Sequence, residues 1–247
     1  KNGLPIKDFL FSDFIKQYTE EYIDFKMPRT KKRDNITIQT FLKLCPDIKY
    51  IDQFNDLALK KYKLRRKDKQ ESTINRELGT LKHMQKIAFE KGYILEDVSK
   101  KTKFLDDDDN KINYVPTDEE IKLFFDVVEE PIRNAVILGL AQGMRSGEAT
   151  HIGPDDFNFE KDFLSIRKKD GWQPKNISST RDMPIHPDFK EYYKKRCEYA
   201  KKVKSPAICC YEDGHPLTEG VLSAMIYKIK HKTLKNKINP NFTFHSL

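Results

Sequence analysis

The stretch Gly143-Met144-Arg145-Ser146-Gly147-Glu148-Ala149-Thr150 directly follows an apolar run, residues 135–141, that predicts a buried helix. Gly143 can end that helix, because glycine tolerates the left-handed backbone of a helix C-cap. The next helix can begin directly after Arg145, which is thereby predicted at a tight junction between two buried elements. A planar, permanently charged guanidinium at such a junction suits a phosphate or a carboxylate. Pairing with the nearby acid Glu148 explains Arg145 as well as a catalytic role does.

The sequence after this junction gives it a family context. A helix, Gly-x-Arg-x-x-Glu, a second helix and then Gly153-Pro154-Asp155-Asp156-Phe157 before a predicted hairpin resemble the tyrosine recombinases, the phage integrase family. In that family the arginine of this box is the first of two that grip the scissile phosphate, and the acid after it gives structural support. The resemblance therefore implies a catalytic role for Arg145.

A second box lies in the stretch Pro174-Lys175-Asn176-Ile177-Ser178-Ser179-Thr180-Arg181-Asp182-Met183-Pro184, which predicts a hairpin loop ending in a short strand. A lysine in such a loop is ordinarily just solvated. The stretch is similar to a lysine box of the integrases, and the resemblance implies that Lys175 protonates the leaving 5′ oxygen. Lys168 and Lys169, at the end of the preceding strand, are the fallback candidates. Arg181 is expected to be structural.

The last residues, Phe242-Thr243-Phe244-His245-Ser246-Leu247, resemble the third box of the family, His-x-Leu-Arg. His245 matches its histidine, a general acid or base near the phosphate. A surface histidine on a frayed terminus is the alternative. The arginine of the box would follow Leu247, and the tyrosine nucleophile of the family would lie further on. We therefore expect a catalytic domain truncated before both residues, and a chain that is inactive by itself.

The positive charge lies in the first part of the chain. Residues 1–103 hold 24 Lys+Arg and 15 Asp+Glu, a net charge of +9, whereas the whole chain has +8. Basic surface on one module is typical of a polyanion-binding protein, although a solvated basic face is also common. Helical spacing of apolar residues throughout this part predicts an all-helical module.

The last predicted helix of this module contains Glu71-Ser72-Thr73-Ile74-Asn75-Arg76-Glu77-Leu78, with a cap at Ser72 or Thr73. Together with Ala88-Phe89-Glu90-Lys91-Gly92-Tyr93-Ile94 it resembles the last long helix of the integrase core-binding domain. Ile74, Leu78, Leu81, Met84 or Gln85, and Ala88 form its apolar stripe. The candidate DNA contacts are basic residues at the start of a helix, basic residues in a loop, and polar or basic residues off the stripe. They are Lys31, Lys32, Arg33, Arg65, Arg66, Thr73, Asn75, Arg76 and Lys82.

The expected fold is mainly α with a small antiparallel β-hairpin or sheet. An all-helical core-binding domain would span residues 1–103, a linker 104–113, and an α+β catalytic domain 114–247. The linker contains Asp106-Asp107-Asp108-Asp109, which lacks the glycine turn and the later acid of a calcium loop, so no metal is expected. Four cysteines without a C-x-x-C pair predict buried thiols in a reducing compartment.

The resemblance implies a site-specific DNA recombinase, or integrase, that forms a 3′-phosphotyrosyl intermediate and needs no cofactor. Its expected partner is a double-stranded DNA attachment site, bound by a homotetramer on synapsed DNA. The expected location is the cytoplasm, in a bacterial or phage-encoded, nucleoid-associated protein, because no apolar run is long enough to span a membrane. One alternative is a DNA-binding module without strand transfer. A metal-dependent nuclease is another, but only the linker aspartates are clustered.

Overall fold

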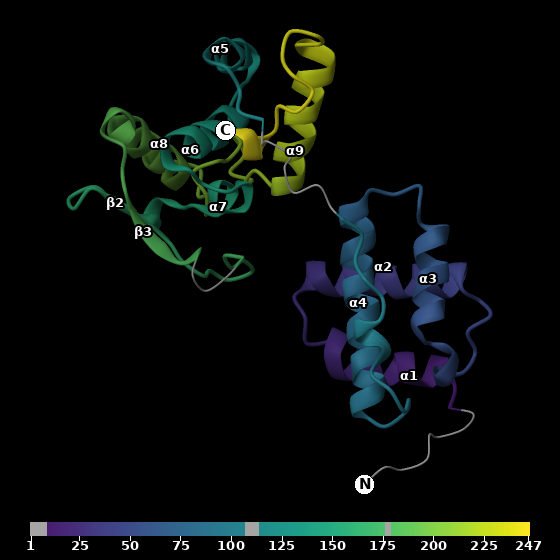
Figure 1. The fold of residues 1–247 in the computed structure, drawn as a ribbon. Coiled ribbons are helices and arrows are strands. Elements are labelled where there is room, and N and C mark those ends of the chain that lie inside the picture. Colours follow the sequence, from purple (N-terminus) through teal and green to yellow (C-terminus); the bar gives the residue numbers. More distant parts are fainter. Residues whose placement is uncertain (1–8, 107–113, 176–178) are drawn as a thin grey trace. The chain divides into compact units, whose positions relative to one another are not determined.

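Two separate hydrophobic cores organise the chain, one before the aspartate run and one after it. The computed structural model describes residues 9–106, 114–175 and 179–247. The chain divides into two compact units, Lys1–Lys111 and Ile112–Leu247 (Figure 1). Each unit is described by itself below.

The first unit is helical. Its helices are α1 (Phe11–Tyr18, continued by a π-helical turn, Thr19–Ile23), α2 (Pro28–Leu44), α3 (Asp56–Arg65) and α4 (Glu71–Glu90). The predicted stripe of α4 is buried throughout, and aromatic rings from the other helices pack into the same core. Burial of one face of each helix thus follows the apolar periodicity of the sequence.

Some helix starts differ from the sequence-based expectation. Helix α4 begins at Glu71, so neither Ser72 nor Thr73 is its N-cap. Proline occupies the first position of α2, where the missing N–H costs nothing. Asn55 caps α3 by accepting hydrogen bonds from the backbone of Leu57 and Ala58. Leu57, at the second position of α3, is exposed.

The second unit combines helices with a small sheet that buries one face in its core. Its helices are α5 (Asp118–Val127), α6 (Ile132–Gln142), α7 (Ser146–His151), α8 (Lys190–Lys202) and α9 (Glu219–Lys228, continued by a π-helical turn, Ile229–Thr233). The strands β1 (Phe157–Asn158), β2 (Phe163–Ile166) and β3 (Arg181–Pro184) form an antiparallel sheet in the order β1-β2-β3. The predicted fold class, mainly α with a small antiparallel sheet, is confirmed.

The register of the sheet fixes where β3 begins. Ile166 pairs with Arg181, and Leu164 pairs with Met183. Leu164 and Ile166 are buried on one face of β2, which is the alternation expected of a half-buried strand. Arg181 therefore lies at the first position of β3, directly opposite the last residue of β2.

Candidate functional site

The junction between α6 and α7 holds Arg145 in an extended backbone conformation. Gly143 ends α6 with a left-handed φ of 60°, as glycine readily does. Met144 is buried and anchors the junction in the core. Arg145 is the N-cap of α7, with φ −70° and ψ 156°. Its side chain keeps 54% of its surface exposed, so a ligand can still reach the guanidinium.

A buried acid holds one edge of that guanidinium. The backbone N–H of Arg145 donates to Glu148 Oε2 at 3.0 Å, and its Nη1 donates to Oε1 at 3.0 Å. Burial of Glu148 raises its pKa, but hydrogen bonds from Arg181 and Arg145 outweigh burial, so the pKa of this carboxyl is lowered. The local pairing considered from the sequence is present, and it leaves the other edge of Arg145 open.

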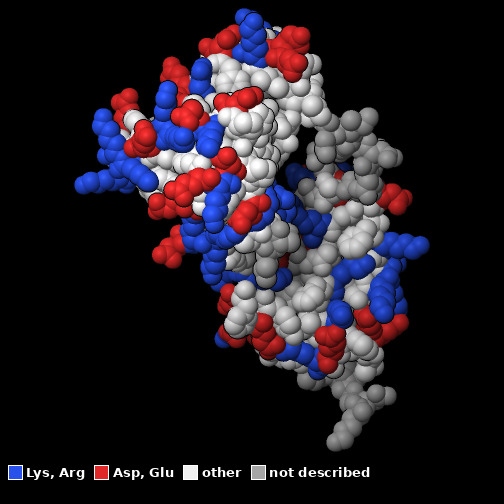
Figure 2. Space-filling model, turned by 90° about the vertical axis from the view of Figure 1, so that its left-hand side faces the viewer, with Lys and Arg blue, Asp and Glu red and all other residues white. Residues whose placement is uncertain are grey.

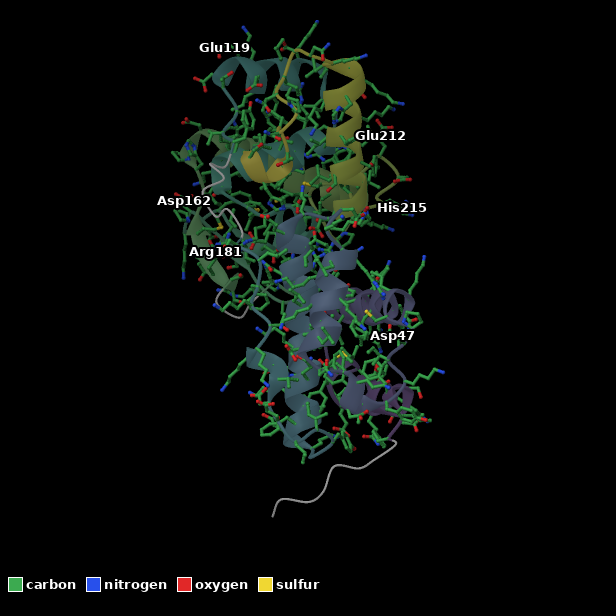
Figure 3. The ribbon with its side chains drawn as sticks, turned by 45° about the vertical axis from the view of Figure 1, so that its right-hand side comes forward. Asp47, Glu119, Asp162, Arg181, Glu212 and His215 are labelled. Carbon is green, nitrogen blue, oxygen red and sulfur yellow. The ribbon has the colours of Figure 1, made fainter. Side chains whose placement is uncertain are left out.

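Arg181 lies at the start of β3 (Figure 3). Its guanidinium contacts the same carboxylate. Its Nη1 donates to Glu148 Oε1 at 3.0 Å, and its Nη2 donates to Oε2 at 2.9 Å. The Nη1 atom also donates to the carbonyl of Ser179, and the hydroxyl of Ser179 lies 3.5 Å from Arg145 Nη1. The start of β3 is thereby joined to the first turn of α7.

The three candidate lysines lie in different surroundings. Lys169 pairs with Asp156 and donates to the carbonyl of His151 at 2.6 Å, so its ammonium is engaged. Lys168 and Lys175 are exposed, and neither has a hydrogen bond or ion pair within residues 9–106, 114–175 and 179–247. Asn176, Ile177 and Ser178, which belong to the lysine box, lie outside the described residues. Of the two strand-end alternatives, Lys169 is therefore the less available as a proton donor.

Trp172 lies beside α7. The short turn that carries it is closed by backbone hydrogen bonds between Lys169 and Trp172. Its ring stacks on His151 with 4.9 Å between ring centroids. Ser146 of α7 in turn donates to Glu219 of α9 at 2.8 Å. Helix α7 thus contacts the turn that carries Trp172 through His151, and the start of α9 through Ser146.

His245 lies on a single 3-10 turn, Phe244–Ser246, and its side chain is exposed. Phe244 is buried against α6, and its ring comes within 3.0 Å of where a Cβ on Gly139 would lie. Helix α6 therefore contacts the turn that carries His245 at Gly139, and the C-terminal end of α6 leads to Arg145. A side chain at Gly139 would require the Phe244 ring to shift.

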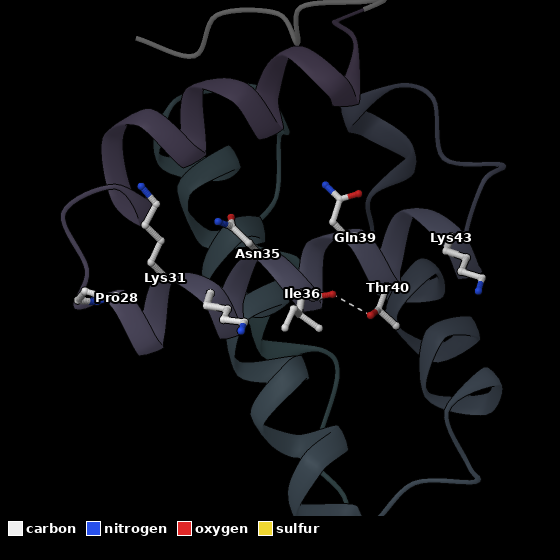
Figure 4. A pocket seen from close by; sticks show the side chains of 8 residues that line it. Pro28, Lys31, Asn35, Ile36, Gln39, Thr40 and Lys43 are labelled. Carbon is white, nitrogen blue, oxygen red and sulfur yellow. Dashed lines mark hydrogen bonds between the residues drawn. The ribbon is translucent and has the colours of Figure 1, made fainter. Parts of the chain in front are cut away.

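In the first unit, the outer face of α2 is hollowed (Figure 4). The residues that line the hollow are Pro28, Lys31, Lys32, Asn35, Ile36, Gln39, Thr40 and Lys43. Lys31 pairs with exposed Asp24 at 2.8 Å, a contact that solvent weakens. Ile36 is 56% exposed in the middle of this face. Lys31 and Lys32 were candidates from the sequence, whereas Asn35, Gln39 and Lys43 were missed, although helical spacing from Lys32 would have found them.

Three other basic candidates of this unit, Arg33, Arg65 and Arg66, are engaged internally. Arg33 donates to buried Asp34 at 3.2 Å. Arg66 lies in a mostly buried ion pair with Glu77, with Nε 2.9 Å from Oε2. Arg65 donates to the carbonyl of Leu44 and lies 3.9 Å from Asp47. Arg65, the last residue of α3, and Arg66, which follows it, are thus hydrogen-bonded to residues of α2 and α4.

Two polar residues of α4 hold the chain segment that follows the helix. The amide of Asn75 donates to the carbonyl of Leu105 at 2.8 Å, and Lys82 donates to the carbonyl of Thr102 at 2.7 Å. Lys82 also lies 4.4 Å from the ring centroid of Phe104. Asn75 and Lys82 are therefore engaged within the first unit, and their expected contact with DNA stays a prediction. Thr73 is partly exposed and Arg76 is exposed.

Charge alone does not outline a binding face. Figure 2 shows Lys and Arg side chains beside Asp and Glu side chains over much of the surface turned to the viewer. A further basic run, with lysines at 228, 230, 232, 235 and 237, begins at the end of α9, and Lys230, Lys235 and Lys237 line a second hollow. Its signal was the absence of any acid between Lys228 and Lys237.

Within the described ranges, no group of His, Cys, Asp and Glu is arranged to hold a metal ion. All four cysteines are buried and free of disulfides. None of the helices in the described part has the length and apolar character needed to cross a membrane.

The comparison with solved structures identifies the fold. The Tn1549 transposon integrase in complex with a circular intermediate DNA matches with a TM-score of 0.76 and 18% identity, over 94% of this chain and 82% of that one. A lambda integrase dimer bound to a COC′ core site matches with a TM-score of 0.74 and 15% identity, over 96% and 67% of the two chains. A lambda integrase tetramer bound to a Holliday junction matches with a TM-score of 0.73 and 15% identity, over 96% and 70%.

The chain has the fold of the tyrosine recombinases, as its motifs predicted. Within that class, the similar structures are integrases of a transposon and of lambda, each solved with DNA. No protein-family profile and no curated protein sequence matches the chain.

Proposed function

We propose that this chain is part of a site-specific DNA recombinase that cuts and rejoins DNA through a 3′-phosphotyrosyl intermediate. The observation that carries the proposal is Arg145, which an ionised, buried Glu148 holds along one edge while half of its side chain stays exposed. A guanidinium fixed in this way presents its remaining N–H groups to an oxyanion without reorganising.

The proposed reaction begins when a tyrosine oxygen attacks the scissile phosphorus. The bond from phosphorus to the 5′ oxygen breaks, and that oxygen takes a proton from Lys175. Arg145 neutralises the charge that builds on the nonbridging oxygens, and His245 acts as the general base that takes the proton lost by the tyrosine hydroxyl. We expect the tyrosine and the second arginine among residues that follow Leu247. The phosphotyrosyl bond keeps the energy of the broken bond for rejoining, so the chemistry needs no cofactor.

We further propose that the first unit binds the double-stranded attachment site through the outer face of α2. Lys32 and Lys43 can reach phosphates, and the amides of Asn35 and Gln39 can reach base edges, as a helix in the major groove does. The second unit would then be the catalytic domain. A homotetramer on synapsed DNA, in a cytoplasmic protein, completes the proposal.

The second candidate is a DNA-binding module without strand transfer. It is supported by the α2 face, whose residues lie in the first unit and use none of the proposed catalytic groups. A nicked suicide substrate separates the two candidates, because the broken strand cannot be rejoined and the protein stays attached to it.

The test incubates the full-length protein with such a substrate in EDTA and resolves the products in denaturing gels. A covalent adduct at the 3′ phosphate, absent from Arg145→Ala, is the expected result. An Arg145→Lys variant should fail as well, since an ammonium lacks the two-pronged contact. Tight DNA binding without any adduct would leave only the binding-module candidate. Cleavage that EDTA abolishes would indicate a metal-dependent nuclease instead.

A further inference from the structure

The carboxylate of Glu148 is shared between two guanidiniums. Its Oε1 accepts from Nη1 of Arg145 and from Nη1 of Arg181, each at 3.0 Å. Its Oε2 accepts from the backbone of Arg145 at 3.0 Å and from Nη2 of Arg181 at 2.9 Å. Arg181 makes the two-pronged contact, and Arg145 makes only one side-chain contact with the acid.

The charges of this trio do not cancel. Two guanidiniums surround one carboxylate, so one positive charge remains. The Glu148 side chain is 3% exposed, that of Arg181 is 31% exposed and that of Arg145 is 54% exposed. The surplus charge is therefore presented to solvent mainly by Arg145, where a phosphate would approach.

Without Arg181, the buried carboxylate would have Arg145 as its remaining guanidinium partner. A buried charge strongly favours full pairing, because its desolvation is otherwise uncompensated. Arg145 would then be drawn into a neutral pair, and its attraction for an anion would fall. A phosphate would have to compete with Glu148 for the same N–H groups.

We propose that Arg181 is a positioning residue: by neutralising Glu148, it leaves the charge of Arg145 available to the scissile phosphate. This inference rests on the proposed recombinase function. Arg181 is suited to the role because strand pairing with Ile166 and its contact with the carbonyl of Ser179 hold it in place. Arg181 itself does not need to touch DNA.

The chain offers a matched control in the same hairpin. Arg167 follows β2 and donates to Asp182 of β3 at 2.6 Å, on the exposed side of the sheet. Arg167→Gln therefore removes an arginine–carboxylate pair of the same hairpin without touching Glu148.

The test compares Arg181→Gln, Arg181→Lys, the double variant Arg181→Gln/Glu148→Gln, and Arg167→Gln in the full-length protein. Adduct formation is measured under single-turnover conditions with saturating DNA, alongside DNA affinity and thermal unfolding. Arg181→Gln should slow adduct formation about 10- to 100-fold, less than the loss of a direct oxyanion donor, with affinity nearly unchanged. Arg181→Lys should lie between Arg181→Gln and the wild type, since it keeps the charge but not the two-pronged contact.

The double variant decides the mechanism. Removing the carboxylate together with Arg181 restores one uncompensated guanidinium, so the double variant should react faster than Arg181→Gln alone. A double variant that reacts no faster than Arg181→Gln would overturn the proposal and leave Arg181 a structural role only. Arg181→Gln that reacts as fast as Arg167→Gln would overturn it too.

If Arg181→Gln does not fold, the rates of adduct formation by Arg181→Lys and by the double variant are compared with that of the wild type, and this comparison tests the proposal instead. A wild-type protein that forms no adduct would instead refute the recombinase function. The two failures are therefore distinguishable.

Discussion

The side-chain amide of Asn75 pairs with both backbone groups of Leu105: its Nδ2 donates to the Leu105 carbonyl at 2.8 Å, and its Oδ1 accepts from the Leu105 N–H at 2.7 Å. Leu105 also packs against the core of the first unit. Leu105, which lies within the predicted linker of residues 104–113, is therefore held against the first unit.

Two asparagine variants should separate folding from DNA binding. Asn75→Ala leaves the backbone of Leu105 without its partners and should lower the free energy of unfolding by about 1–3 kcal/mol, with DNA affinity preserved. Asn35→Ala, on the outer face of α2, should weaken DNA binding while stability stays within about 0.5 kcal/mol. Urea unfolding and fluorescence anisotropy measure the two effects. Weakened DNA binding by Asn75→Ala at unchanged stability would instead support the DNA contact that the sequence predicts for Asn75.

The lysines of α2 should set part of the salt dependence. Each phosphate contact contributes roughly 0.9 to the slope of log affinity against log salt concentration. Lys32→Ala/Lys43→Ala should reduce that slope by about two units. Lys86→Ala, which removes an exposed lysine of α4, is the control and should leave the slope unchanged. An equal reduction for both would show that the α2 face is not a specific contact surface.

Arg66 should matter for stability rather than for DNA. Its ion pair with Glu77 is mostly buried, and Tyr62 donates to the same carboxylate at 2.8 Å. Arg66→Met leaves that carboxylate uncompensated and should destabilise the protein by on the order of 3 kcal/mol. The double variant Arg66→Met/Glu77→Gln should regain a large part of the stability that Arg66→Met loses. Thermal unfolding measures this difference. If the single variant is as stable as the wild type, the pair is dispensable.

The stability that Glu148 contributes should depend on pH. The pKa of Glu148 in the folded chain is below its ordinary value of 4.5, because hydrogen bonds from both arginines outweigh the effect of burial. The unfolded state therefore binds the proton more readily, and the contribution is present above 4.5 and lost as the pH falls through the lower folded value. The difference in free energy of unfolding between wild type and Glu148→Gln should shrink below about pH 4.5. A difference that stays constant down to about pH 3 would contradict this.

A sulfur-containing substrate should identify the proton donor. If Lys175 protonates the leaving 5′ oxygen, Lys175→Ala in the full-length protein should slow cleavage about 10²- to 10⁴-fold. A 5′-bridging sulfur leaves as a thiolate and needs little protonation, so it should restore much of that rate. It should restore far less to Arg145→Ala, whose defect is charge stabilisation. Rescue of Lys168→Ala or Lys169→Ala instead would place the donor at the end of β2.

The sequence by itself determined the local architecture. Apolar periodicity gave the buried stripe of α4, and Thr117 caps α5 as expected, by accepting from the backbone of Glu120. Gly143 ends α6 in the left-handed conformation that its lack of a Cβ allows. These features depend on neighbours within one or two helical turns, which the order of residues specifies directly.

Only the tertiary structure decided which polar residues are free. Asn75 and its partner Leu105 are 30 residues apart, and Arg181 and Glu148 are 33 apart. Periodicity says that a residue lies off the apolar stripe, but not which distant backbone group or acid packing will bring beside it. Buried polar groups must be paired, so those partners are set by whatever the folded chain leaves unsatisfied. For that reason periodicity did not predict the internal contacts of Asn75, Lys82 and Arg66 in the first unit.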